Sequence, residues 1–201
     1  MKLRSITLFF TLAAASVAAH AQGGIYATFD AQDFTRTHLF ANPPAGSNNA
    51  DSPWLYGGGF GAYLTPSRIH IPKLGTLHTG PIKLGIDGRG DFLRTASQYS
   101  RDDGIISIRV TPKGSMGGIR PYIQGGAGVG HTKYPGQLNY TNNWTYLIAL
   151  GADHKIKGRV DWRLFDVGWG FMGNYASSPV AGGSNYLITV GTGIAFRASG
   201  K

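Results

Sequence analysis

The C-terminal stretch Asn185–Arg197 reads NYLITVGTGIAFR, and apolar residues alternate in it with small or polar ones. The even-numbered positions are mostly apolar and comprise Tyr186, Ile188, Val190, Thr192, Ile194 and Phe196. Alternation with a period of two residues is the pattern of a β-strand that has one apolar face. The stretch therefore predicts a strand, and the rest of the chain must supply the sheet that it joins.

The N-terminus has the pattern of an export signal. Lys2 and Arg4 precede an apolar run over residues 6–19, and Ala19 and Ala21 are the small residues expected before a cleavage site. The run is shorter than the roughly 20 apolar residues that a membrane-spanning helix needs. We therefore expect a signal peptide at residues 1–21 and a single mature domain over residues 22–201.

The composition favours strands and turns over helices. The chain has 31 glycines and 12% aromatic residues. It has 0 cysteines, so no disulfide stabilises it although export leads to an oxidising compartment. The formal net charge is +9, and removal of Lys2 and Arg4 lowers it to +7. No nucleic-acid-binding motif accompanies this charge, and an exported chain meets anionic lipid first, so we expect no nucleic-acid partner.

Eight segments show strand-type alternation between connections rich in glycine, proline and polar residues. They cover residues 24–34, 54–64, 80–93, 104–111, 119–131, 143–153, 159–171 and 185–197. Long and short connections alternate, as they do in bacterial membrane barrels, where the short turns face the periplasm. The link over residues 65–79 departs from this rule, because it is long where a short turn is expected.

The segment 80–93 shows the polarity of the predicted sheet most clearly. Its apolar positions are Ile82, Leu84, Ile86 and Phe92, and the charged residues Lys83, Asp87, Arg89 and Asp91 occupy the opposite face. A soluble barrel of this size usually places its apolar face inside. A charged face opposite an apolar one instead indicates lipid outside and a polar lumen inside.

The same reasoning predicts a network of paired charges in the lumen, because unpaired charges away from water are costly. Its expected members are Lys83, Asp87, Arg89, Asp91, Arg109, Asp161, Arg163 and Asp166. In the segment 159–171 the apolar positions change from even numbers to odd ones. We predict a β-bulge at Phe165 and Asp166, because one extra residue moves every later side chain to the other face and brings Asp166 inside.

Three stretches together resemble a known family. They are Arg120–Gly130 (RPYIQGGAGVG), Val160–Leu164 (VDWRL) and the closing strand, in which Thr189, Gly191, Ile194 and Phe196 fill a pattern of polar, glycine, apolar and aromatic places. The mature chain is similar to the small eight-stranded outer-membrane β-barrels of the OmpA, OmpX and OmpW type.

The resemblance implies an all-β fold, an eight-stranded antiparallel up-and-down transmembrane barrel, located in the outer membrane of a Gram-negative bacterium. It also implies contact with outer-membrane lipid and lipopolysaccharide. The four residues of the closing pattern would serve as the signal that the barrel-assembly machinery reads.

Aromatic and basic residues are sorted along the predicted strands. Aromatic side chains near the strand ends suit the interfacial girdles of a membrane barrel. Basic residues lie at or beyond the expected periplasmic ends, namely Lys113, Arg120, Lys155, Lys157, Arg159, Arg197 and Lys201. They are either contacts for anionic phospholipid headgroups or solvated turn charges.

The sequence carries no pattern that predicts catalysis or a cofactor. The glycine-rich stretches 57–61 and 125–130 lie within alternating segments, and no helix follows them to bind a phosphate. The histidines lack metal-ligand spacing, so we expect no metal. Lipid A deacylases with this fold resemble one another in a His-x-Ser pair, and here no histidine is followed two places later by serine. We therefore expect that the chain is not an enzyme.

The sequence thus favours a monomeric barrel with a structural or surface-interaction role and a lumen filled by side chains. The long connection over residues 35–53 is the expected contact surface. A small-solute channel of the porin kind is the main alternative, and a lipid A-modifying enzyme is a further one. Conductance tests the first alternative, and analysis of lipid A tests the second.

The export signal leads to a first prediction. The mature protein should begin at Gln22 and fractionate with outer membranes. Intact-mass analysis of the purified protein checks this, and retention of residues 1–21 would contradict the signal-peptide interpretation.

Overall fold

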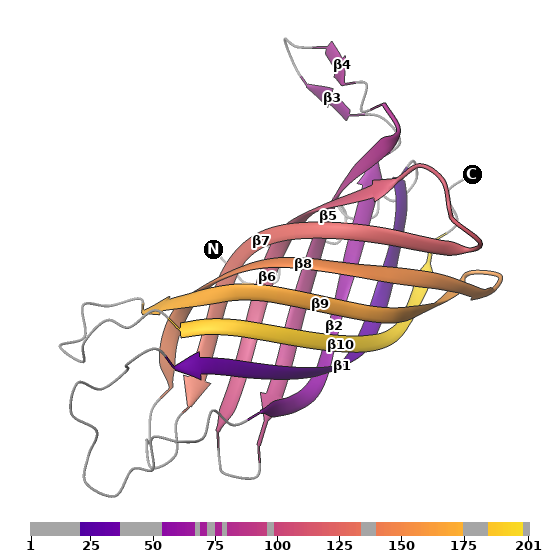
Figure 1. Ribbon diagram of the computed structural model, residues 1–201. Helices are drawn as coiled ribbons and strands as arrows, with labels where there is room; N and C mark the ends of the chain where they lie inside the picture. The colour runs from indigo at the N-terminus through magenta and orange to yellow at the C-terminus, as the bar shows by residue number, and fades with distance from the viewer. Residues whose placement is uncertain are drawn as a thin grey trace, which may run out of the picture.

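Eight antiparallel strands close into a barrel in the computed structural model, which describes residues 21–36, 54–66, 69–71, 75–77, 80–95, 99–133, 140–174 and 185–198 (Figure 1). The barrel strands are β1 (Ala21–Arg36), β2 (Leu55–Pro66), β5 (Ile82–Arg94), β6 (Ser100–Pro112), β7 (Ile119–Lys133), β8 (Thr141–Lys157), β9 (Val160–Asn174) and β10 (Asn185–Arg197). Their order is that of the chain, and β1 closes the barrel by pairing with both β10 and β2. The predicted all-β, eight-stranded up-and-down barrel is confirmed.

Some of the sequence-based expectations concern residues outside this part of the chain. Residues 1–20 of the expected signal peptide and residues 37–53 of the expected contact loop are not among the described residues. Among the described residues, no helix is long and apolar enough to cross a membrane.

The long link between β2 and β5 contains a small sheet of its own. β3 (Ile69–Ile71) and β4 (Gly75–Leu77) pair as an antiparallel hairpin, with Ile69 opposite Leu77. Figure 1 shows this hairpin projecting away from the barrel wall. The sequence pattern predicted the unusual length of the link but no strands within it.

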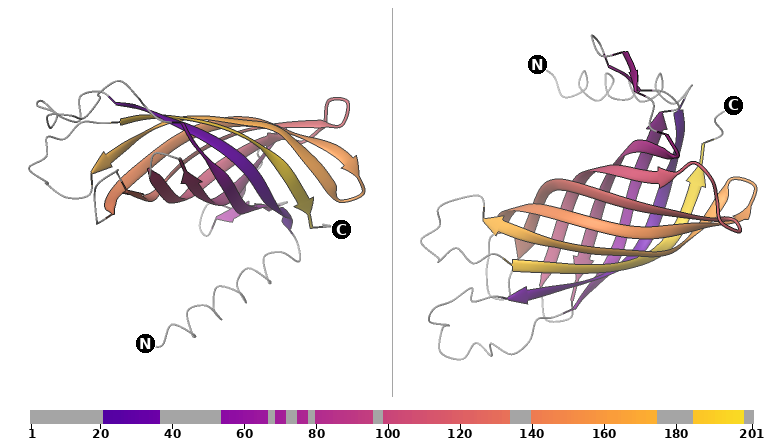
Figure 2. Two further views of the ribbon diagram at one scale, coloured as in Figure 1. Left: turned by 90° about the horizontal axis from the view of Figure 1, so that it is seen from below. Right: turned by 45° about the horizontal axis from the view of Figure 1, so that its top comes forward.

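The two ends of the barrel differ in their connections. At one end, called here the terminal end, β1 begins beside the end of β10, and the backbone N–H of Ala198 donates a hydrogen bond to the carbonyl of Gly23 (2.8 Å). The same end holds the tight β6–β7 and β8–β9 connections (Figure 2). Gly118 and Gly158 adopt positive φ angles of 83° and 57° in these turns, a conformation that glycine tolerates best. The opposite end is called the loop end.

The outer wall of the barrel is apolar and the interior is polar. Ile106 is 70% exposed and Trp169 is 62% exposed, whereas Arg163 and Asp166 are both 0% exposed. Aromatic side chains of neighbouring strands stack along the outer wall, for example Tyr146 on Phe171 with ring centroids 4.7 Å apart. Such a surface is stable only in an apolar solvent, so the barrel spans a membrane.

The predicted change of side-chain parity in β9 is confirmed, but its position is one residue earlier than predicted. Ala152 pairs with Phe165 and Asp153 pairs with Arg163, so Leu164 has no partner in the β8 register. The register with β10 shifts at the same place. Phe165 therefore points outward, Asp166 points inward, and the bulge lies at Leu164 and Phe165 rather than at Phe165 and Asp166.

The closing pattern of β10 divides between the two faces. Thr189 and Gly191 are buried inside the barrel, whereas Ile194 and Phe196 are exposed on the outer wall, with Phe196 51% exposed. Phe196 pairs with Ile25 of β1 and Val160 of β9, so it lies at the terminal end of the seam that closes the barrel. This placement fits the proposed role of Phe196 in assembly.

We predict that Phe196→Asp lowers the yield of folded protein in the outer membrane several-fold, because it removes the closing aromatic residue and places a charge on the lipid face. Phe196→Leu is the matched control, since it keeps the apolar face. Quantitative immunoblots of outer-membrane fractions measure the effect. A normal yield of the aspartate variant would refute the assembly role.

Candidate functional site

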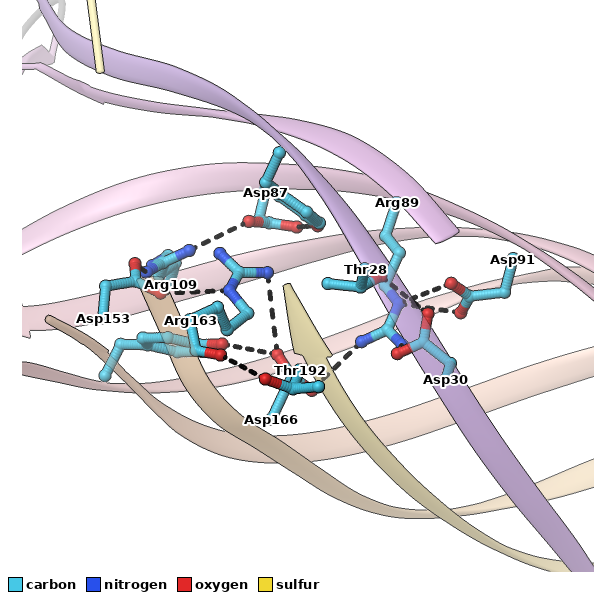
Figure 3. A network of polar contacts seen from close by, with 12 residues as sticks. Thr28, Asp30, Asp87, Arg89, Asp91, Arg109, Asp153, Arg163, Asp166 and Thr192 are labelled. Carbon is cyan, nitrogen blue, oxygen red and sulfur yellow. Dashed lines mark hydrogen bonds and ion pairs between the residues drawn. The ribbon is translucent and has the colours of Figure 1, made fainter. Parts of the chain in front are cut away.

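The centre of the barrel interior is built around one guanidinium group. Arg89 of β5 forms ion pairs with Asp30 of β1 (2.9 Å), Asp91 of its own strand (2.7 Å) and Asp166 of β9 (3.0 Å). The planar guanidinium has five N–H donors, so it can serve three carboxylates at once. Thr28 adds a hydrogen bond from its hydroxyl to Asp30 (2.6 Å). Figure 3 shows these side chains converging from opposite sides of the lumen.

A second group of charges lies nearer the terminal end. Arg109 and Arg163 share the carboxylate of Asp153, at 2.8 and 3.0 Å. Arg109 also pairs with Asp87 at 3.3 Å, and Arg163 approaches Asp166 at 3.8 Å. Because Asp166 contacts both Arg89 and Arg163, it joins the two groups into one network (Figure 3).

Two tyrosines support this network from within. Tyr26 donates a hydrogen bond to Asp87 (2.7 Å), and Tyr122 donates one to Asp166 (2.5 Å). The guanidinium carbon of Arg163 lies 3.8 Å from the ring centre of Tyr26, and that of Arg109 lies 3.6 Å from the ring centre of Tyr122. Each tyrosine therefore satisfies a carboxylate with its hydroxyl and an arginine with its ring face.

Inward-facing glycines provide the space that the network occupies. A β-carbon on Gly59 would lie 2.5 Å from a carboxylate oxygen of Asp30 and 2.7 Å from the hydroxyl oxygen of Thr28. A β-carbon on Gly191 would collide with the other carboxylate oxygen of Asp30. A larger residue would displace Asp91 and Asp30 at Gly59, and Asp30 at Gly191, from their positions beside Arg89, so these glycines are part of the site.

Apolar side chains fill one side of the lumen at the loop end. Leu55, Leu93, Met172 and Leu187 form a buried cluster against which Tyr99 packs. A further buried charge lies next to this apolar plug, because Arg101 is in contact with Met172 and pairs with Asp103 at 2.9 Å. The interior therefore changes along its length from an apolar plug to the ion-pair network.

The terminal end of the lumen holds a cavity of about 420 Å³. Arg120 and Arg197 share the carboxylate of Asp161 beside it, the latter at 2.8 Å. Arg109 and Asp153 of the network form part of its wall. The cavity therefore extends from the ion-pair network towards the terminal end of the barrel.

The structure brings together six of the eight charges that the sequence predicts for the lumen, namely Asp87, Arg89, Asp91, Arg109, Arg163 and Asp166. Asp161 pairs instead with Arg120 and Arg197, and Lys83 lines the cavity. Sequence reasoning omitted Asp30, Asp153, Arg101 and Asp103 from the network. Asp30 and Asp153 occupy the alternate positions of their strands that face inward. This alternation could have identified them from sequence.

Nothing in the described part of the chain resembles a metal centre, since no three histidine or acidic side chains come together there in a geometry that could hold an ion. The carboxylates of the lumen are directed at arginines instead. The lumen charges of the described strands thus pair with one another.

A closed antiparallel barrel with an even number of strands, an apolar outer wall and a charged interior is the architecture of bacterial outer-membrane proteins. The chain is a small transmembrane β-barrel. Its terminal end, which carries the short turns, is the end expected to face the periplasm, and its loop end is the end expected to face outward.

No protein-family model matches the chain, and no curated protein matches its sequence. Several solved structures align with it. Neisserial surface protein A aligns over 87% of this chain and 96% of its own length, with 8% identity and a TM-score of 0.49. Ail, the attachment invasion locus protein of Yersinia pestis, covers 89% of this chain and 99% of its own, with 12% identity and a TM-score of 0.43.

The N-terminal β-barrel domain of Pseudomonas aeruginosa OprF covers 88% of this chain and 99% of its own, with 13% identity and a TM-score of 0.34. At such identities the likeness concerns the fold alone.

The central ion pairs lead to a stability prediction. Arg89→Met should destabilise the barrel by about 3–5 kcal/mol, because it leaves the buried carboxylates of Asp30 and Asp91 without a cation and Asp166 with Arg163 alone. Arg94→Met is the control, since the Arg94 side chain is 51% exposed in its pair with Asp102 and its loss should cost about 0–1 kcal/mol. Guanidinium unfolding followed by tryptophan fluorescence measures the free energy of unfolding of both variants. An equal loss in the two would contradict the central role of Arg89.

Proposed function

We propose that this protein is a monomeric, non-conducting outer-membrane barrel that works through its surfaces, in a structural or interaction role. The observation that carries the proposal is the filling of the lumen. Leu55, Leu93, Met172 and Leu187 occupy the loop end, and the ion pairs of Arg89, Arg109 and Arg163 occupy the middle. An eight-stranded barrel is only wide enough for such side chains, so no open path remains for a solute to cross the middle of the lumen.

The apolar plug distinguishes this lumen from that of a porin. A water-filled channel needs polar side chains along its whole length, since an apolar constriction excludes water and ions. Leu55 and Leu187 are both 0% exposed and Leu93 is 1% exposed, and Arg101 at the same level is 0% exposed, which supports a lumen that is filled at the loop end. The small-solute channel is therefore the less supported alternative.

A surface role follows from what remains accessible. Because the middle of the lumen and its loop end are occupied by the protein's own side chains, we propose that partners meet the outer wall, which faces lipid and lipopolysaccharide, or the connections at the two ends. The four residues of the β10 pattern are proposed to serve recognition by the barrel-assembly machinery. A catalytic role is not proposed, because the charged side chains of the lumen pair with one another.

We expect the purified mature protein to show no large, stable single-channel currents in a planar lipid bilayer. A general porin reconstituted in the same way is the positive control, and faster migration of the unheated than of the boiled protein in gel electrophoresis confirms that the barrel is folded. Stable currents from the heat-modifiable protein would reject the proposal and support the channel alternative. Altered lipid A in cells that overproduce the protein would support the enzyme alternative instead.

A further inference from the structure

The cavity at the terminal end is surrounded by positive charge. Its wall includes one acidic side chain, Asp153, and six basic ones, namely Lys83, Arg109, Lys113, Arg120, Arg159 and Arg197. Lys83 belongs to β5 and Arg197 to β10, whereas Lys113 and Arg159 lie in the two short turns. The wall therefore carries a clear excess of positive charge around one opening.

Part of this charge is not neutralised by the protein itself. Arg109 is paired with Asp87 and Asp153, and Arg120 and Arg197 share the single carboxylate of Asp161. Lys113 and Arg159 are exposed and form no ion pair with any of the residues that the structure describes. A concave site with low-dielectric walls and charge of one sign concentrates anions.

The cations lie on opposite sides of the opening. In the closed strand order, β6, which leads into Lys113, is four strands away from β10, which carries Arg197. β5, which carries Lys83, is likewise four strands away from β9, which begins just after Arg159. In a ring of eight strands this separation is the largest possible. A ligand that engages both sides therefore needs at least two anionic groups.

The chemistry of the wall favours phosphate. Arginine presents paired N–H donors that match a phosphate group, and lysine adds a point charge. The volume of about 420 Å³ lies within the range of small-molecule sites, about 300–1,000 Å³. We propose that this cavity binds a water-soluble periplasmic anion that carries two or more phosphate groups.

The position of the cavity favours a soluble ligand over a lipid headgroup. Its lining residues Thr65, Arg109 and Asp153 are buried on the inner face of the barrel, and the seam beside it is closed by the hydrogen bond between Ala198 and Gly23. Lipid lies against the outer face of the same strands. This site is independent of whether the lumen conducts.

The test measures binding of inorganic pyrophosphate to the mature protein in an uncharged detergent by isothermal titration calorimetry. The double variant Lys113→Gln/Arg159→Gln removes two cations from the cavity wall. The double variant Lys155→Gln/Lys157→Gln is the matched control, because both lysines are exposed at the same end and neither lines the cavity. Heat-modifiability in gels shows that each variant is folded.

We expect pyrophosphate to bind the native chain, with an affinity that falls as salt rises. The cavity variant should bind roughly ten-fold more weakly or worse, since charge-assisted hydrogen bonds are lost, and the control should bind like the native chain. Absence of pyrophosphate binding, or equal weakening in both variants, would overturn the proposal. Binding of a lipid headgroup instead would also overturn it. In that case phosphatidylglycerol nanodiscs would stabilise the native protein but not the cavity variant, and pyrophosphate would not bind.

Discussion

The ion pairs between Arg89 and the carboxylates of Asp30, Asp91 and Asp166 are the interaction on which the rest of this barrel depends. Lipid surrounds the outer wall, so every charge that faces inward must find its partner within the lumen. One guanidinium that reaches β1, β5 and β9 ties together strands that do not neighbour one another in the sheet. The backbone ladder closes the barrel, and this network fills it.

Several local features of the chain follow from that requirement. The β9 bulge turns Asp166 inward, where it contacts both Arg89 and Arg163. Gly59 and Gly191 lack the side chains that would displace Asp30. Beyond the network the lumen changes character, with the apolar plug at one end and the basic cavity at the other. The two ends of the molecule therefore offer different chemistry to their surroundings.

Much of this architecture could be predicted from sequence, because each barrel strand has one apolar and one polar face. The change of the apolar positions from even to odd numbers around Asp166 also predicted a bulge, although the structure places it at Leu164 and Phe165. Arg101 and Asp103 were missed because β6 begins at Ser100, earlier than its alternation indicated. The plug was missed because an inward leucine such as Leu55 contradicts the polar-inside pattern. The pairing of the charges depends on distances across the lumen, and a local sequence pattern carries no information about those distances.

The most direct test of this account is a double-mutant cycle between Arg89 and Asp166. The free energy of unfolding is measured for the native chain, Arg89→Met, Asp166→Asn and the double variant. If the two side chains form one buried network, the double variant should lose less stability than the sum of the single ones, with a coupling of about 2 kcal/mol. Effects that add to within about 0.5 kcal/mol would show that the lumen charges act independently and would contradict the account.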